Sequence, residues 1–174
     1  MRWCAVLAAA AGLCACGGAG DPGGDAAPGA FLAFTTTFAE FRSWPSFHSD
    51  GPADDGTVPA DVLGPRTQYL RTPPPHGATA FPVGSVIVEA RESGARKIFA
   101  GVKRGGGFNA GGAADWEWFE LSEQPVTIVW RGVGPPIGDT YGGDPNGGCN
   151  ACHAKCAGND YVCSPRLALG AVDQ

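Results

Sequence analysis

FPVGSVIVEA, residues 81–90, is the stretch from which the fold of this chain is best inferred. It is rich in β-branched residues and is entered through a Pro-Val-Gly turn, a combination typical of a β-strand. A short loop leads from it to KIFAGVK, residues 97–103, which has the same character. Two such strands joined by a short loop predict an antiparallel sheet in the middle of the chain.

Two further strands are predicted after residue 114. DWEWFEL, residues 115–121, alternates strongly, with Trp116 and Trp118 on one face and the acidic residues on the other. A tryptophan stripe usually belongs to the core, but it can also form the apolar wall of a cofactor site. VTIVW, residues 126–130, is expected to be a further, mostly buried strand.

Two other segments complete the predicted domain. Residues 104–114, RGGGFNAGGAA, lack the G-x-G-x-x-G spacing, so we expect a flexible hairpin connection and not a phosphate-binding loop. Residues 36–47 carry Phe38, Phe41 and Trp44 close to a helical period, which predicts an amphipathic helix packed on the sheet. The predicted fold class is α+β, mainly β: an antiparallel sheet packed with a few helices.

The N-terminus has the features of an export signal. One arginine precedes an apolar run, residues 3–15, which is too short for a comfortable membrane span. Leu13-Cys14-Ala15-Cys16 resembles a bacterial lipobox, so residues 1–16 are expected to be a signal peptide, with Cys16 acylated. This predicts a lipoprotein that faces the periplasm or lies on the cell surface. The alternative is an ordinary signal peptide, cut near Ala15 or slightly later, without a lipid.

Composition changes sharply after this signal. Residues 17–30 contain only Gly, Ala, Asp and Pro, so a flexible linker is predicted. Residues 31–174 have the usual length of one domain with one core. Removing Arg2 leaves 11 of the 12 basic residues against 17 acidic ones, a net charge of −6. With no basic cluster, a nucleic-acid partner is not expected, and the membrane would be contacted only through the lipid.

The C-terminal part contains a short motif with specific chemistry, CNACH at residues 149–153. A C-x-x-C-H run is what covalent attachment of a c-type haem needs. Cys149 and Cys152 can add to the two vinyl groups of one porphyrin, and His153 then lies under the iron as its axial ligand. The motif predicts one covalent haem c, held by this C-terminal attachment segment.

Two cysteines remain once the signal, the lipid site and the haem have been assigned theirs. Cys156 and Cys163 are seven positions apart, and in an exported protein we expect them to form a disulfide. The alternative is a zinc or iron–sulfur site, because C-x-x-C-H-x-x-C-x6-C offers four thiolates and an imidazole within 15 residues.

The side of the iron opposite His153 is expected to be open. The only methionine is Met1, so the His/Met ligation of ordinary electron-transfer cytochromes c is not available. His48, His76 or a lysine could supply a sixth ligand instead, although both histidines lie in segments that suggest solvated loops. A five-coordinate haem can bind a small molecule, whereas a six-coordinate haem mainly transfers electrons.

These residues together resemble the cytochrome P460 superfamily, which also contains the β-type cytochromes c′. The resemblance spans about residues 38–169. It implies an antiparallel sheet packed with a few helices, often a homodimer, and a haem c with an open distal side. The matching segments are FRSW (41–44), FPVGSVIV (81–88), AGVK (100–103) with the glycines after it, WEWF (116–119), CNACH (149–153) and NDYV (159–162).

The resemblance implies two different functions. Cytochrome P460 ties a lysine to the porphyrin and oxidises hydroxylamine, whereas the β-type cytochromes c′ bind nitric oxide or carbon monoxide in an apolar distal pocket. The P460 lysine directly follows the last valine of the first central strand, where this chain has Glu89 after Val88. A carboxylate cannot form that cross-link, so binding of a small gaseous or nitrogen-oxide ligand, or transfer of single electrons to an unknown partner, is the predicted function.

Three residues are candidates for the distal side. Phe99 stands where P460 has an acid and would crowd the pocket together with Val88. Glu89 is interpreted in two ways, as a solvated strand carboxylate or as a distal acid that exchanges protons with a bound ligand. The second interpretation keeps an alternative function open, an oxidoreductase for hydroxylamine or a related nitrogen species. A third possible function is that of a redox module in which His48 or His76 ligates the iron.

Overall fold

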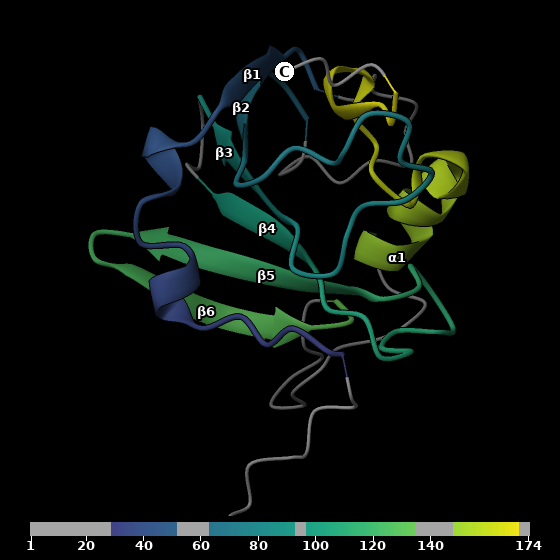
Figure 1. The fold of residues 1–174 in the computed structure, drawn as a ribbon. Helices are drawn as coiled ribbons and strands as arrows, with labels where there is room; N and C mark the ends of the chain where they lie inside the picture. The colour runs from purple at the N-terminus through teal and green to yellow at the C-terminus, as the bar shows by residue number, and fades with distance from the viewer. Residues whose placement is uncertain (1–28, 52–62, 93–96, 135–147, 171–174) are drawn as a thin grey trace, which may run out of the picture.

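The structure, a computed structural model, describes residues 29–51, 63–92, 97–134 and 148–170. In this part of the chain six strands form one antiparallel sheet, and each strand pairs with its neighbours in sequence, in the order β1-β2-β3-β4-β5-β6 (Figure 1). The predicted class, α+β and mainly β, is confirmed. The strands are β1 (Ser46–Ser49), β2 (Arg66–Leu70), β3 (Val86–Arg91), β4 (Ile98–Lys103), β5 (Trp116–Glu123) and β6 (Val126–Gly132).

The helical part of the described chain is small. It has one α-helix, α1 (Gly148–His153), and the short 3-10 helices η1 (Thr35–Thr37), η2 (Phe41–Ser43), η4 (Ala154–Asn159) and η5 (Pro165–Leu167). The prediction of an amphipathic helix over residues 36–47 is wrong. Its aromatic residues recur every three positions, which is the period of a 3-10 helix. The chain accordingly makes two 3-10 turns there and then enters β1.

The four strands predicted from residues 81 to 130 are present as β3, β4, β5 and β6. One detail is wrong, because β6 is not mostly buried. It is the edge strand next to β5, and its residues alternate between partly buried and exposed positions. Val129 is 57% exposed. The run VTIVW therefore resembled a central strand only in its composition.

Two strands were missed in the sequence, β1 and β2. β1 is a short edge strand in which three of four residues are polar. β2 reads Arg-Thr-Gln-Tyr-Leu, yet four of its five residues are buried. Polar residues are rarely buried without partners, so this strand could be recognised only from the groups that face it across the sheet.

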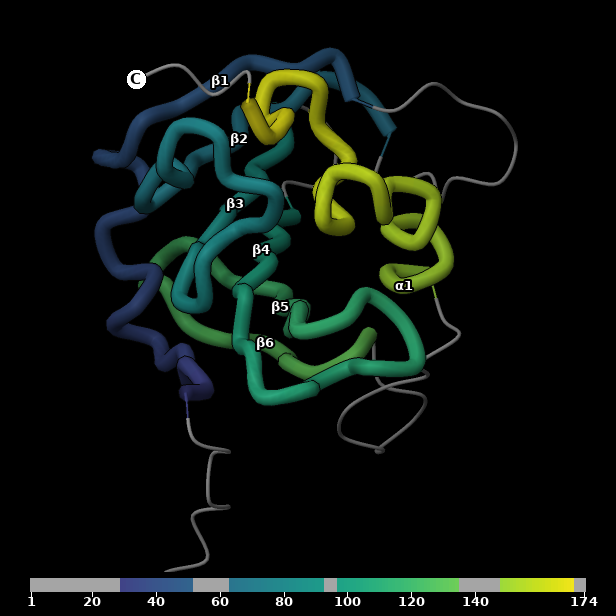
Figure 2. Tube along the Cα trace, turned by 45° about the vertical axis from the view of Figure 1, so that its right-hand side comes forward, coloured from purple at the N-terminus to yellow at the C-terminus, as the bar shows by residue number. Residues whose placement is uncertain are grey.

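Each face of the sheet is covered by a different end of the domain. The η1–η2 segment covers one face, where Phe38 and Phe41 pack with Val88 and Phe119. The C-terminal segment covers the other, where Val162 and Leu167 pack with both tryptophans of β5. Figure 2 shows the N-terminal turns and α1 on opposite sides of the sheet. The site described below lies between the sheet and the C-terminal segment.

The export predictions fall almost entirely outside the described residues. The predicted signal peptide, Cys16 and the predicted linker up to residue 28 belong to that part of the chain. Among the residues that the structure describes, no helix is long and apolar enough to cross a membrane.

Candidate functional site

Strand register brings one row of side chains together on the face that α1 covers. Gln68, Glu89, Phe99 and Glu120 are direct partners across β2, β3, β4 and β5. In a sheet, such partners lie on the same face and side by side. Glu120 therefore shares the face of Trp118, and the prediction that the acids of β5 lie opposite the tryptophans holds only for Glu117.

The next row on this face is apolar, and its middle position has no side chain. Ile87, Gly101 and Trp118 are cross-strand partners. A Cβ atom at Gly101 would lie 2.8 Å from Cζ3 of Trp118, closer than real contacts allow. The absence of a side chain at Gly101 therefore lets the indole lie flat across β4, where it stacks on Trp116 with ring centroids 6.0 Å apart and planes 7° apart.

A cavity of about 320 Å³ lies between these rows and the C-terminal segment. Its volume is at the lower end of the range for small-molecule and cofactor sites, and its walls are mainly apolar, as such sites are. Its lining includes residues from four strands and from α1, so it joins parts of the chain more than 80 residues apart. The lining residues are Arg66, Gln68, Ile87, Glu89, Lys97, Phe99, Ala100, Gly101, Trp116, Trp118, Phe119, Glu120, Gly148, Cys149, Cys152, His153, Tyr161, Val162 and Cys163.

The three residues of the haem motif all line this cavity. Cys149 and Cys152 are three positions apart on α1, so both thiols lie on one face of the helix. His153 is the last residue of the helix, and its ring lies 4.1 Å from that of Trp118, centroid to centroid. The structure thus brings together the two thiols and the imidazole that the sequence predicted to act as a unit.

The imidazole of His153 is held in a defined orientation. Its Nδ1 lies 2.6 Å from the backbone carbonyl oxygen of Tyr161, a distance at which Nδ1–H donates to the carbonyl. That bond fixes the tautomer and leaves Nε2 as the ring nitrogen with a lone pair. Burial lowers the pKa of His153, although the hydrogen bond to Tyr161 and the charge of Glu89 oppose this effect. A neutral imidazole is the form that ligates a metal.

The low pKa of His153 predicts how the stability of the chain without cofactor depends on pH. In the folded state burial disfavours protonation of the ring, while the unfolded chain takes up a proton below its ordinary pKa of about 6.5. Stability should therefore fall as pH drops below about 6.5, by at most about 1.4 kcal/mol per pH unit from this group. Urea unfolding at pH 7 and pH 5 measures it. His153→Gln should flatten the dependence, whereas His76→Gln, at an exposed position, should not. Equal slopes in all three proteins would contradict the prediction.

Asn150, between the two cysteines, anchors α1 and was not foreseen from the sequence. It is 2% exposed. Its Oδ1 accepts hydrogen bonds from Nε1 of Trp118 at 2.9 Å and from Nδ2 of Asn109 at 2.8 Å, and its own Nδ2 donates to Asn109 at 2.8 Å. The helix is thereby tied both to β5 and to the glycine-rich loop that contains Gly112. A Cβ atom at Gly112 would lie 2.1 Å from Nδ2 of Asn150.

Glu89 is not a solvated strand carboxylate. It lines the cavity, and its side chain is 22% exposed. Arg66, whose side chain is 5% exposed, donates from Nη1 to its Oε1, and Gln68 donates from Nε2 to its Oε2 at 3.0 Å. Gln68 is in turn held by Ser164, whose Oγ donates to Oε1 of Gln68 at 2.5 Å. The carboxylate is therefore fixed in position by neighbours that no local sequence motif marks.

The other distal candidates are placed differently. Phe99 lines the cavity, as its register with Glu89 requires. Val88 does not, so its prediction is wrong: neighbouring strand residues point to opposite faces, and Val88 is fully buried in the core beneath η1 and η2. Lys97 also lines the cavity, 3.7 Å from Glu120.

Neither histidine considered as a sixth ligand lies at this cavity. His48 lies in β1 and is the cross-strand partner of Thr67 in β2. Nδ1 of His48 is 2.9 Å from Oε1 of Glu92. Thr67 is the neighbour of the cavity residue Gln68, so it points to the other face of the sheet. His76 is exposed in the loop before β3. The described residues thus leave His153 as the histidine that lines this cavity.

The predicted disulfide between Cys156 and Cys163 is present. It links the two ends of the segment that contains Tyr161, the residue whose carbonyl oxygen binds His153. It also takes two of the four thiolates that a zinc or iron–sulfur site would have used, which leaves Cys149 and Cys152 as thiols. Within the described ranges, no group of three or more His, Cys, Asp or Glu side chains could hold a metal ion.

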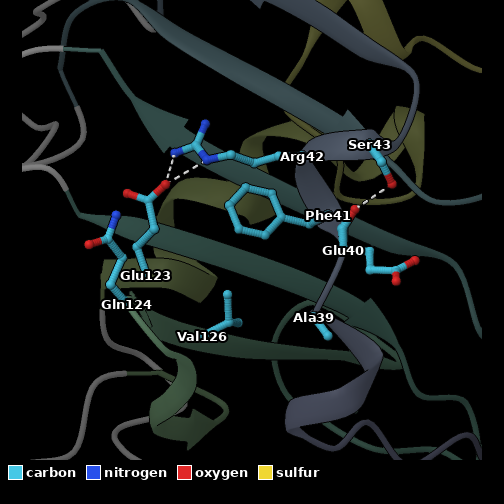
Figure 3. Close-up of a pocket in the computed structure, with 8 residues that line it drawn as sticks. All are labelled: Ala39, Glu40, Phe41, Arg42, Ser43, Glu123, Gln124 and Val126. Carbon is cyan, nitrogen blue, oxygen red and sulfur yellow. Dashed lines mark hydrogen bonds and ion pairs between the residues drawn. The ribbon is translucent and has the colours of Figure 1, made fainter.

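A second hollow, of about 620 Å³, is lined by residues of the sheet face that η1 and η2 cover; Figure 3 shows its lining side chains. Arg42 crosses it and donates from Nε to Oε1 of Glu123 at 2.6 Å. The remaining lining comes from residues 39–43 and from the turn between β5 and β6. Its lining holds no cysteine or histidine, and the charges of Arg42 and Glu123 satisfy each other, so it offers none of the donors that line the first cavity.

Comparison with known proteins identifies no relative: no protein-family model, no curated protein and no solved structure matches this chain. Function therefore has to be argued from the site itself. The donor set fits a haem, because two thiols on one helix face and a neutral imidazole border one mainly apolar cavity.

Proposed function

We propose that this protein is an exported mono-haem c-type cytochrome. Cys149 and Cys152 would hold the porphyrin through thioether bonds, and Nε2 of His153 would ligate the iron. The observation that carries the proposal is that these three side chains line one cavity while Nδ1 of His153 is engaged by the carbonyl of Tyr161. A proximal histidine is held in this way in metal sites generally. When bound, the haem supplies a one-electron redox centre with a position for a small ligand.

The proposal includes an open sixth position that binds nitric oxide or carbon monoxide, or else a role in single-electron transfer. It is supported by the positions of His48 and His76 away from the cavity, and by the presence of Phe99 in the cavity wall. Membership of the cytochrome P460 and β-type cytochrome c′ superfamily, export, and acylation of Cys16 belong to the same proposal.

An absorption spectrum of protein produced in a host that attaches haem c tests this function. A five-coordinate site should give a high-spin spectrum, which should shift when nitric oxide or carbon monoxide is added. A low-spin spectrum that does not respond to these gases would show that the protein supplies a sixth ligand. Purified protein without haem, or with zinc bound to the thiols, would refute the whole proposal.

One observation favours the second candidate function, oxidation of hydroxylamine or a related nitrogen species. Glu89 faces the same cavity as His153, and its carboxylate is held between Arg66 and Gln68. A fixed carboxylate in a partly buried site can accept a proton from a substrate N–H or O–H group. Nitric oxide and carbon monoxide carry no such proton, so a role of this kind would be specific to the enzyme.

Replacing Glu89 with Gln separates the two functions. In an enzyme that uses this base we expect the turnover of hydroxylamine to fall about 100-fold or more, because the amide cannot accept the proton, while haem content stays unchanged. In a gas-binding protein the affinity for nitric oxide should change little. Glu120→Gln is the matched control, since Glu120 lines the same cavity in the same row but pairs with Lys97 and Trp130. Equal loss of turnover in both variants would argue against a specific role for Glu89.

A further inference from the structure

The carbonyl that binds His153 belongs to an unusual stretch of backbone. Asp160 and Tyr161 both have positive φ angles, of 50° and 65°. Non-glycine residues rarely adopt this left-handed conformation, and two in succession need support from their surroundings. The direction of the Tyr161 carbonyl depends on these two residues. What holds Asp160 in place therefore decides where the carbonyl points.

Three groups from the sheet side converge on Asp160. Lys103 at the end of β4 donates from Nζ to Oδ1 at 2.6 Å, and the backbone N–H of Phe81 donates to Oδ2 at 2.9 Å. Nε1 of Trp116 donates to the backbone carbonyl oxygen of Asp160 at 2.8 Å. Both carboxylate oxygens and the carbonyl are thus bound, each by a different segment of the domain.

The ion pair between Lys103 and Asp160 is itself buried. The two side chains are 8% and 10% exposed. Lys103 is further held by the carbonyl oxygen of Ala114 at 3.3 Å and lies over the ring of Trp116, 5.5 Å from its centroid. Buried ion pairs contribute little net stability compared with apolar residues, while the bonds made here hold the carboxylate of Asp160 in one position. The pair is better suited to fixing a position than to strengthening the fold.

We infer that Asp160 and Lys103 are positioning residues for the axial histidine, acting through the carbonyl of Tyr161. The inference rests on the proposed function, since it concerns the imidazole that would ligate the haem iron. Lys103 and Trp116, cross-strand partners in β4 and β5, hold Asp160. Asp160 holds the left-handed turn, and the turn directs the carbonyl oxygen at Nδ1 of His153. Donation from Nδ1–H makes the imidazole a more basic ligand.

The test uses Asp160→Asn and Lys103→Met in the haem-loaded protein, read by the iron–histidine Raman band and the reduction potential. Loss of the hydrogen bond from His153 weakens the ligand, so in both variants the band should move to lower frequency and the potential should rise. A purely electrostatic effect would move the potentials in opposite directions, because one variant removes a negative charge and the other a positive one. Lys103→Arg, which keeps the charge, should restore wild-type values.

Glu117→Gln is the matched control. Glu117 is 1% exposed and paired with Arg131 at 2.7 and 2.9 Å, but it lies on the other face of the sheet. This variant should lower the melting temperature without moving the Raman band or the potential. If Asp160→Asn and Lys103→Met behave in the same way as this control, the inference is overturned and the pair is only structural.

The failure of the proposed function would be seen separately, as absence of haem from the wild-type protein. In that case the positioning can still be measured on the full chain by ¹⁵N NMR of the His153 ring. The wild type should show the tautomer protonated at Nδ1, and Asp160→Asn should lose this preference. An unchanged tautomer in the variant would overturn the inference.

Discussion

Replacing both Cys149 and Cys152 with alanine is expected to abolish covalent attachment of haem. Each thiol forms one thioether bond to a vinyl group in the proposed arrangement, and no other cysteine is available in the domain once Cys156 and Cys163 are joined. Haem staining after denaturing electrophoresis measures the attached fraction, which should fall from nearly all of the protein to none. Each single variant should keep a reduced fraction, held by one remaining bond.

The control for this experiment is the other pair of cysteines. Replacing Cys156 and Cys163 with alanine removes a disulfide across seven residues, which should cost about 2–3 kcal/mol of stability. Haem should nevertheless stay covalently bound. The result would contradict the proposal if haem remained attached without Cys149 and Cys152, or if only the disulfide pair proved necessary.

The second large effect is expected at Asn150. Replacing it with leucine keeps the branched shape of the side chain but leaves Nε1 of Trp118 without an acceptor in a buried site. A buried polar group that loses its partner costs about 1–3 kcal/mol, and Asn109 loses two bonds as well. We expect a total loss of about 3 kcal/mol, which lowers the melting temperature by about 10 °C. Thermal unfolding followed by circular dichroism measures it.

The chain offers two matched controls for this prediction. Ala151 is the other residue between the cysteines, and it is exposed, so Ala151→Asn should have almost no effect. Gly112→Ala should reproduce the loss, because its Cβ would collide with Asn150, whereas nothing lies within 4 Å of a Cβ atom at Gly111. Similar melting temperatures for Gly111→Ala and Gly112→Ala would show that the anchor is not needed.

Much of the fold could be predicted because β3 to β6 are marked by local patterns. Apolar alternation and β-branched residues identify strands wherever one face is buried. β2 could not be predicted in this way, since its Arg66 and Gln68 are buried only because Glu89 and Ser164 bind them. The turns at residues 35–43 were mistaken for an α-helix because their aromatic spacing of three residues is close to the 3.6 residues per turn of such a helix.

The same distinction applies to the site. Cys149, Cys152 and His153 were identifiable because their chemistry requires fixed spacing within five residues. The groups that hold them were not, because they are separated from the motif in sequence and act through single hydrogen bonds. Nothing local at Asn150 signals that Trp118 will reach it. A backbone carbonyl such as that of Tyr161 has no signature in the sequence.

The order of the strands has a consequence for how the protein matures. Every strand pairs with the one before it, so the sheet can grow by successive hairpins as the chain emerges, and contacts of this local kind favour rapid folding. The segment that carries the thiols comes last and docks on a surface already formed. Under the proposed function we expect an interval, before that docking, in which the thiols are accessible to an enzyme that attaches haem. Stopped-flow refolding should show sheet formation, followed by circular dichroism, preceding the last change in tryptophan fluorescence.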